Sequence, residues 1–338
     1  MSQPARHRWI VGGKGPGSAL LSCALLAGVC VLAACGSAPA TVPKNTVNIA
    51  YAGSLVNLME HHLVPGFEHA TGYPAQGKGA GSTALANQIK SKLIQPDVFI
   101  SASTGAYKTL QGDANGNLVT WYMSFAATSM VIGYSPKSQY ASQFQAAANG
   151  GTPWYQVLET PGLRLGRTDP ALDPKGVNTL YTVQLAAIYY QQTGLAQGVL
   201  GANNNPAQIF PEEDLVARLG SGQLDAGFFY LNEVKDAGLP YIALPAQINL
   251  GDPTEATYYA QASYTPAGGT KQTGKPILYS VTILSMAKNA VGGDAFVTYL
   301  LGSAGQGLLT ADGIRPIAIA FSGDASKVPA DLAQYTHS

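Results

Sequence analysis

The sequence is poor in charge, histidine and cysteine. Only 11% of the 338 residues are charged, and 19 basic residues balance 19 acidic ones. No Lys/Arg cluster occurs in the body of the chain, so the sequence predicts no nucleic-acid-binding surface. It also lacks a zinc-binding pattern, a Gly-x-Ser-x-Gly elbow, a P-loop and a dinucleotide fingerprint. With only five histidines, a general base for a serine nucleophile is hard to find.

The three cysteines all lie close to the N-terminus, and the third marks a processing site. The basic residues Arg6, His7, Arg8 and Lys14 precede a short apolar run at 19–34, which leads into Leu-Ala-Ala-Cys-Gly at 32–36. This pattern is typical of an export signal rather than a membrane span. The ending resembles a bacterial lipobox, which predicts removal of residues 1–34 and lipidation of Cys35. A plain secretory signal with a chance cysteine is the alternative.

The remaining chain is predicted to be a tether followed by a two-lobed domain. Residues 35–46 are rich in Ser, Ala, Pro and Thr, a composition typical of a linker at the membrane surface. About 300 residues follow the signal, more than one hydrophobic core holds comfortably. The expected boundaries of the domain are 47–325, with one lobe at about 47–130 plus 250–325, the other at 131–249, and a tail at 326–338.

Strand-like and helix-like runs alternate along this domain. The alternation predicts α/β lobes, each a mostly parallel sheet flanked by helices, with the ligand in the cleft between the lobes. The expected strands are 47–51, 96–100, 129–134, 163–167, 226–230, 241–244 and 277–284. The expected helices are 55–70, 83–93, 179–192, 211–219, 294–301 and 304–311, and 265–275 is expected to be a surface loop.

The tripeptide Ala-Gly-Ser occurs twice, at 52–54 and 80–82, each time where an expected strand ends and a helix begins. Glycine permits close approach of the backbone to a ligand, and serine caps a helix while offering a hydroxyl. Unpaired N–H groups and the helix dipole favour an anion at such a turn. Two facing turns therefore predict an anion site built around Ser54 and Ser82. Ordinary helix capping is the alternative role of each serine.

Three further positions are candidates for the same site. Asp173 lies in a stiff loop with two Asp-Pro steps ahead of a helix, where turn formation and capping are the alternative roles. Glu212 and Glu213 open another helix, where acidic residues also favour the helix dipole. Tyr230 ends a strand, where a tyrosine more often packs in the core than binds a ligand. Three histidines on the helix at 55–70 are interpreted as a solvated face.

The chain from about 47 to 317 resembles the tungstate/molybdate-binding proteins of ABC importers. The matching pieces are Ala52-Gly53-Ser54-Leu55, Ala80-Gly81-Ser82, Asp97-Val98, Trp121-Tyr122 through Phe125-Ala126, Asp173-Pro174 with Gly176, Ser221-Gly222 with Asp225, Leu244-Pro245 with Ile248-Asn249-Leu250, and Gly274-Lys275-Pro276-Ile277. The resemblance implies a two-lobed periplasmic-binding-protein fold with an oxyanion in the cleft. It also implies a monomeric binding protein without enzymatic activity or cofactor, served by a membrane permease.

The same resemblance implies the ligand residues. The two serine ligands of the family match Ser54 and Ser82, and the tyrosine near the cleft matches Tyr230. In members with octahedral coordination of the metal, the aspartate matches Asp173 and the glutamate matches Glu212, or Glu213 after a one-residue slip. Lys175 departs from the family pattern.

Chemistry gives the carboxylates a role in selection. They repel a dianion unless they bind its central atom, which Mo(VI) and W(VI) permit and sulfur and phosphorus do not. A binding protein for another small solute on the same scaffold, and a secreted hydrolase, remain the alternatives.

Overall fold

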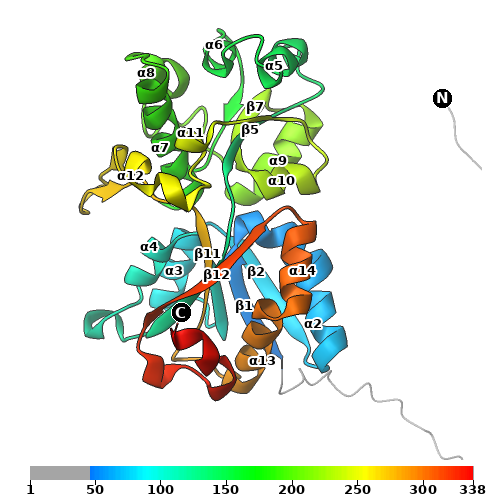
Figure 1. The fold of residues 1–338 in the computed structure, drawn as a ribbon, viewed down its shortest axis with the longest axis vertical. Coiled ribbons are helices and arrows are strands. Elements are labelled where there is room, and N and C mark those ends of the chain that lie inside the picture. The colour runs from blue at the N-terminus through cyan, green and yellow to red at the C-terminus, as the bar shows by residue number, and fades with distance from the viewer. Residues whose placement is uncertain (1–45, 338) are drawn as a thin grey trace, which may run out of the picture. The chain divides into compact units, whose positions relative to one another are not determined.

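Two β-sheets organise residues 46–337, the part of the chain that the computed structural model describes (Figure 1). The first sheet has the strand order β12-β4-β11-β3-β1-β2, and the second has the order β6-β7-β5-β8. The strands are β1 Val47–Ala52, β2 Ala75–Ala80, β3 Val98–Ser101, β4 Trp121–Ala127, β5 Met130–Tyr134, β6 Leu165–Gly166, β7 Ala226–Tyr230, β8 Tyr241–Ala243, β11 Leu278–Ile283 and β12 Arg315–Gly323. A separate hairpin pairs β9 Ser263–Tyr264 with β10 Gln272–Thr273.

Helices surround each sheet and define two lobes. Those beside the first sheet are α1 Val56–Leu58, α2 Val64–Thr71, α3 Ser82–Lys90, α4 Thr104–Lys108, α13 Ala290–Leu301 and α14 Ser303–Ala311. Those of the second lobe are α5 Ala141–Ala148, α6 Trp154–Leu158, α7 Pro174–Tyr189, α8 Leu195–Leu200, α9 Glu212–Ser221, α10 Leu231–Asp236, α11 Ala246–Asn249 and α12 Ala256–Tyr259.

Strand directions in both sheets are mixed. β1 pairs in parallel with β2 and β3, as helical crossovers allow, whereas β11 runs antiparallel to β3 and β4, and β12 antiparallel to β4. In the second sheet only β6 and β7 pair in parallel. The chain leaves the first sheet at the end of β4 and returns through β11, so the returning strand runs the opposite way. The predicted two-lobed α/β class is confirmed, but the prediction of mostly parallel sheets is wrong.

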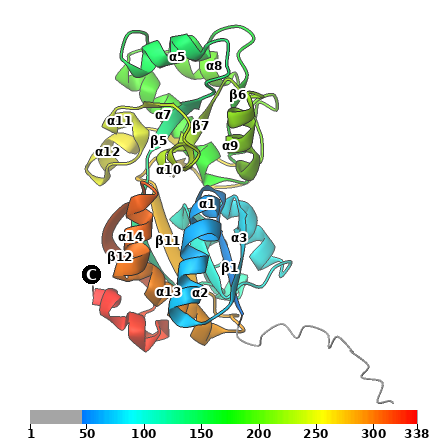
Figure 2. The same ribbon diagram turned by 90° about the vertical axis from the view of Figure 1, so that its right-hand side faces the viewer.

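Apolar faces of the helices pack on both sheets. Figure 2 shows α2, α13 and α14 on one side of the first sheet and α3 beside β1. The ring of Phe67 in α2 meets Phe296 of α13 edge-on at 5.2 Å between centroids. In the second lobe Trp154 of α6 meets Phe228 of β7 in the same way at 6.5 Å. These aromatic contacts join helices to helices and to strands within each lobe.

Local sequence signals account for some element boundaries and miss others. The helix predicted at 55–70 is present as a continuous run from Gly53 to Thr71, with a π-helical turn at Met59–Leu63 and an end at Gly72, whose φ of 72° suits glycine. Strands β2, β4 and β12 were not expected. β2 reads Ala-Gln-Gly-Lys-Gly-Ala and lies at the sheet edge, so it carries little strand propensity.

The predictions for the N-terminus concern residues that the structure does not describe. The signal at 1–34, Cys35 and most of the tether lie outside the described residues. Within residues 46–337 no helix is both long and apolar enough to cross a membrane.

Candidate functional site

The two Ala-Gly-Ser turns lie at the carboxyl ends of neighbouring strands. Ser54 follows β1 in a short 3-10 turn, and Ser82 is the first residue of α3, directly after β2 and Gly81. Both side chains are buried, with 5% and 1% of their surface exposed. Adjacent parallel strands therefore bring the two serines to one edge of the first sheet.

Both serine hydroxyls accept a hydrogen bond from the protein interior. Tyr279 of β11 donates its hydroxyl to Ser54 Oγ at 3.0 Å, and the backbone N–H of Ala102 donates to Ser82 Oγ at 3.1 Å. A hydroxyl carries one hydrogen besides its lone pairs. Because the oxygens are already used as acceptors, each serine retains its hydrogen for an acceptor in the cleft. The arrangement suits an anion.

Asp173 supplies a carboxylate from the second lobe. Its Oδ1 caps α7 by accepting the backbone N–H of Lys175 at 2.6 Å, so the predicted capping role is present. Its Oδ2 is buried and has no hydrogen-bond partner among the described residues. Burial, reinforced by the negative charge of Glu212, raises the pKa of Asp173 well above its usual range. One oxygen of Asp173 thus caps α7, and the other lies against the carboxyl group of Glu212 without a hydrogen-bond donor among residues 46–337.

Glu212 and Lys175 form a buried ionic group with Glu233. Glu212, the first residue of α9, is 5% exposed, whereas Glu213 is exposed. The ammonium of Lys175 lies 3.2 Å from Glu212 Oε1 and 2.6 Å from Glu233 Oε1. Burial alone would lower the pKa of Lys175, but the surrounding carboxylates outweigh it and raise that pKa. One cation therefore faces three carboxyl groups when Asp173 is counted.

Tyr230 ends β7 and points its hydroxyl toward this group. The hydroxyl accepts a hydrogen bond from Asn178 Nδ2 at 2.9 Å, which leaves its own hydrogen free. Burial, together with the charge of Asp173, raises the pKa of Tyr230 well above its ordinary value, so the phenol stays protonated. Its backbone N–H donates to Glu233 Oε2 at 2.7 Å, which fixes Glu233 under Lys175.

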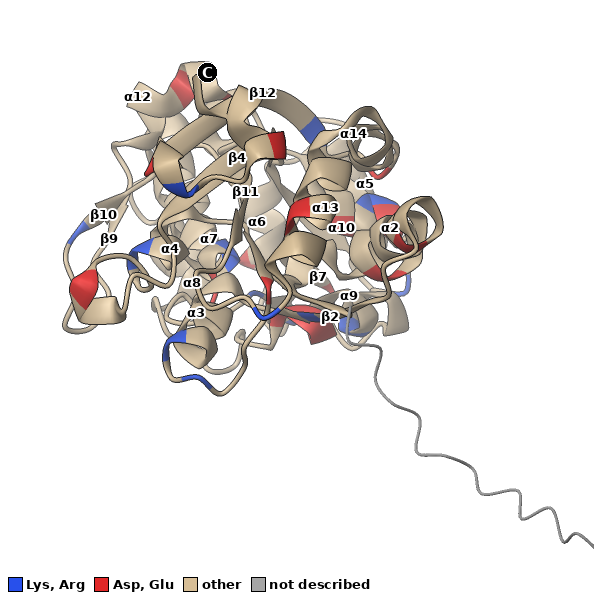
Figure 3. Ribbon diagram, turned by 90° about the horizontal axis from the view of Figure 1, so that it is seen from below, with Lys and Arg blue, Asp and Glu red and all other residues tan. Residues whose placement is uncertain are grey.

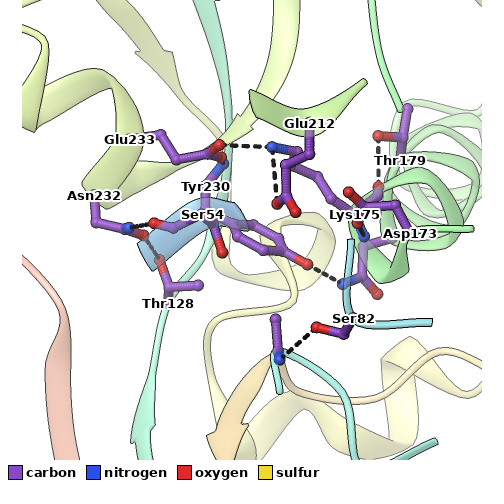
Figure 4. Close-up of polar contacts among 12 residues, drawn as sticks. Ser54, Ser82, Thr128, Asp173, Lys175, Thr179, Glu212, Tyr230, Asn232 and Glu233 are labelled. Atoms are coloured by element: carbon purple, nitrogen blue, oxygen red, sulfur yellow. Dashed lines mark hydrogen bonds and ion pairs between the residues drawn. The ribbon is translucent and has the colours of Figure 1, made fainter. Parts of the chain in front are cut away.

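A second hydrogen-bond chain joins the two lobes directly. Asn232 donates through Nδ2 to the carbonyl of Ser54 at 2.7 Å, and its Oδ1 accepts the hydroxyl of Thr128 at 3.0 Å. Figure 4 shows this chain beside Ser54, and shows Ser82 below Asp173, Lys175 and Glu212. Polar side chains of the two lobes thus meet directly at this place.

Glycine makes this close approach possible. A Cβ at Gly53 would lie 2.5 Å from Glu212 Oε2, and one at Gly81 would lie 2.9 Å from the carbonyl oxygen of Leu172. Two cavities open on Glu212: one of 170 Å³ lined by Gly53 and Ser54, the other of 330 Å³ lined by Gly81 and Asp173. Because neither glycine carries a Cβ, Glu212 approaches the turn at Gly53, and the backbone of Leu172 approaches the turn at Gly81.

The five predicted site residues gather in one place, but sequence reasoning missed their support. Asn178, Asn232, Glu233 and Tyr279 received no role, and Lys175 was noted only as a departure. The spacing from Tyr230 to Glu233 is that of a capping box, which is one signal that points to Glu233. The three histidines of the helix at 55–70 are exposed, and within residues 46–337 no group of three or more His, Cys, Asp or Glu side chains fits a metal ion.

A two-lobed fold with a buried polar site between its sheets defines the class of binding proteins. The family model for bacterial extracellular solute-binding proteins matches residues 47–315, and the chain belongs to that family. Membership confirms the prediction of a binding protein rather than an enzyme, against the hydrolase alternative.

Relatives agree with this assignment. A solute-binding protein of Halobacterium salinarum is 34% identical over 258 residues, covering 75% of this chain and 80% of its own. A putative ABC transporter molybdenum-binding protein of Haloferax volcanii is 34% identical over 237 residues, covering 70% and 72%. The molybdate/tungstate-binding protein WtpA of Thermococcus kodakarensis is 28% identical over 315 residues, covering 86% and 87%.

The fold also resembles a solved structure. The periplasmic molybdate-binding protein of Azotobacter vinelandii superposes with a TM-score of 0.53 at 18% identity, covering 79% of this chain and 98% of that one. At this identity the likeness concerns the fold.

Proposed function

We propose that this protein captures tungstate or molybdate outside the cytoplasm and passes it to the membrane permease of an ABC importer. The names of the Haloferax and Thermococcus relatives support this ligand class. The observation that carries the proposal is the pairing of hydroxyl donors with a buried carboxyl oxygen that has no hydrogen-bond donor among residues 46–337. Ser54 and Ser82 keep hydrogens to donate, and Asp173 Oδ2 is buried without a partner.

The donors and the carboxylates act on different parts of the ligand. Ser54, Ser82 and Tyr230 donate hydrogen bonds to the oxygens of the oxyanion. Asp173 and Glu212 supply carboxylate oxygens to the Mo or W atom and complete an octahedral shell. Sulfur and phosphorus accept no such ligands, so the same carboxylates repel sulfate and phosphate. Burial of Glu212 and exposure of Glu213 favour Glu212 for this role.

The location proposed for the protein is the outer face of the cell membrane. The leader ending at position 34 and the Leu-Ala-Ala-Cys-Gly pattern support a lipid anchor on Cys35. The tether at 35–46 then carries the binding domain close to the permease.

Isothermal titration with tungstate, molybdate, sulfate and phosphate tests the ligand. We expect tight binding of tungstate, molybdate or both, and none of the other two anions. Asp173→Asn and Glu212→Gln keep side-chain size while removing charge, and each is expected to weaken tungstate binding. Tighter tungstate binding by the double variant would contradict octahedral coordination. A wild-type protein that binds neither metal oxyanion would favour another solute on this scaffold.

A further inference from the structure

A large basic cavity lies beside the proposed oxyanion site. It measures 650 Å³ and is bounded by α4, the start of α7 and the connection between β9 and β10. Among the described residues that line it, the charged ones are Lys108, Lys271 and Lys275, and none is acidic. Figure 3 shows basic positions on α4 and beside β10 on the same side of the molecule. Such a cavity concentrates positive potential in a chain whose net charge is zero.

A smaller cavity adjoins this basic cavity and is lined by two residues that hydrogen-bond to the proposed oxyanion site. Its volume is 90 Å³, and it shares Ser103, Asn178 and Lys275 with the large one. It is also lined by Ala102, whose N–H donates to Ser82, while Asn178 donates to the hydroxyl of Tyr230. The lysines therefore lie one cavity away from two of the proposed ligand residues.

The three lysines lack carboxylate partners. None of them takes part in an ion pair among residues 46–337. Lys275 donates instead to the hydroxyl of Thr104 at 2.8 Å. Its side chain is exposed over much of its length, but desolvation of the ammonium, followed by the charge of Lys108, lowers the pKa of Lys275. Lys108 and Lys275 thus line one cavity and repel one another there.

The oxyanion site does not attract anions from a distance. Its single ammonium, on Lys175, is held by Glu212 and Glu233, and Asp173 adds another carboxyl group. Long-range attraction of a dianion must therefore come from charges outside the site. The basic cavity is placed to supply it.

We propose that Lys108, Lys271 and Lys275 form an encounter site that captures small inorganic oxydianions before they reach Ser54 and Ser82. This proposal rests on the proposed function, because it treats the cleft as the final oxyanion site. The encounter site raises the association rate constant of the oxyanion. The dissociation rate constant is determined by the buried site. It selects for charge and not for the central atom, so sulfate enters it as readily as tungstate.

Association kinetics test the encounter site. Stopped-flow measurement of the intrinsic protein fluorescence gives the association rate constant for tungstate at several ionic strengths. The triple variant Lys108→Gln, Lys271→Gln, Lys275→Gln is expected to lower that constant about tenfold at low salt and to flatten its salt dependence. The dissociation rate constant stays unchanged.

A charge-matched control isolates the position of the lysines. Lys90→Gln, Lys288→Gln and Lys327→Gln remove three exposed charges that line none of these cavities. We expect the control to change the association rate constant less than about twofold. Equal losses in both triple variants, or no loss in either, would overturn the proposal.

A second measurement does not depend on tungstate. Lysines carrying ¹³C-methyl groups are followed by NMR in the full chain during titration with millimolar sulfate, and assigned from the single Lys→Gln variants. The signals of Lys108, Lys271 and Lys275 are expected to shift together, and those of Lys90, Lys288 and Lys327 to stay. Absence of that shift contradicts the encounter site. Failure of wild-type protein to bind tungstate, with the shift present, contradicts only the proposed function.

Discussion

The two faces of the site are chemically unlike. The face from the first sheet is uncharged and offers the hydroxyls of Ser54 and Ser82, held by Tyr279 and a backbone N–H. The face from the second lobe is ionic and combines Lys175 with buried carboxyl groups. Uncharged donors bind the oxygens of any oxyanion, whereas buried charges distinguish one oxyanion from another. If the proposed function is correct, both faces are expected to contribute to tungstate affinity, and only the ionic face is expected to distinguish tungstate from sulfate.

The largest effect is expected when the ionic face loses its only cation. Lys175→Met leaves Glu212 and Glu233 buried without their partner, which destabilises a protein by about 3–5 kcal/mol. Urea unfolding of the ligand-free protein measures this loss. Adding Glu233→Gln to Lys175→Met removes one unpaired charge and is expected to restore part of the stability.

Lys235→Met is the control for that experiment, since Lys235 is exposed on neighbouring α10. Its free energy of unfolding is expected to stay within about 0.5 kcal/mol of wild type. Equal losses of unfolding free energy in Lys175→Met and Lys235→Met would show that the buried ion pairs of Lys175 do not stabilise the fold.

The serine face is probed by Ser54→Ala and Ser82→Ala. Each removes a donor to a doubly charged ligand, a bond worth about 1.5–3 kcal/mol, so each is expected to weaken tungstate binding about tenfold or more. Titration calorimetry gives the dissociation constants. The preference for tungstate over sulfate is expected to stay, because the ionic face is intact. Unchanged affinity in both variants would reduce the serines to helix caps.

The pH dependence of stability tests Asp173. Its raised pKa means that the ligand-free fold holds a proton that the unfolded chain releases. The folded state then binds more protons, so the free energy of unfolding falls as pH rises from the ordinary carboxyl range through the raised pKa. Asp173→Asn removes this part of the slope. Unfolding at a series of pH values measures it, and an unchanged slope in the variant would contradict the assignment.

Tungstate affinity is expected to follow pH with the opposite sign. Coordination to the metal requires the deprotonated carboxylate, so affinity rises with pH below the raised pKa, by up to about tenfold per pH unit. Titration in buffers of different ionisation enthalpy counts the proton released. Affinity that falls with rising pH would instead indicate that protonated Asp173 donates a hydrogen bond to the anion.

The smallest effect on binding is expected at the lipid anchor, which belongs to neither face. Cys35→Ser is predicted to move the protein from the membrane fraction to the soluble fraction. Its tungstate affinity is expected to equal that of wild type. Fractionation and titration measure the two properties, and membrane retention of the variant would contradict lipidation of Cys35.

The sequence allowed prediction of the parts of the site that local structure positions. Ser54 and Ser82 follow from a strand-to-helix turn that a few residues specify, and Asp173 follows from an Asp-Pro step before a helix. The partnership of Lys175 with Glu233 joins residues 58 positions apart, and that of Tyr279 with Ser54 joins residues 225 apart. No local pattern specifies such pairs, because they depend on how the sheets assemble. The mixed strand directions were missed for the same reason.

The position of β11 determines the order in which the lobes are able to fold. All four strands of the second sheet come from one continuous stretch, 130–243, so that sheet is complete once this stretch exists. In the first sheet β11 (278–283) lies between β3 and β4 and pairs with both. The sheet therefore cannot be complete until β11 has paired with them. Pairings between distant segments form slowly, since a long loop must close first. We therefore expect the second sheet to be able to complete its strand pairing before the first sheet, which needs strands from the C-terminal part of the domain.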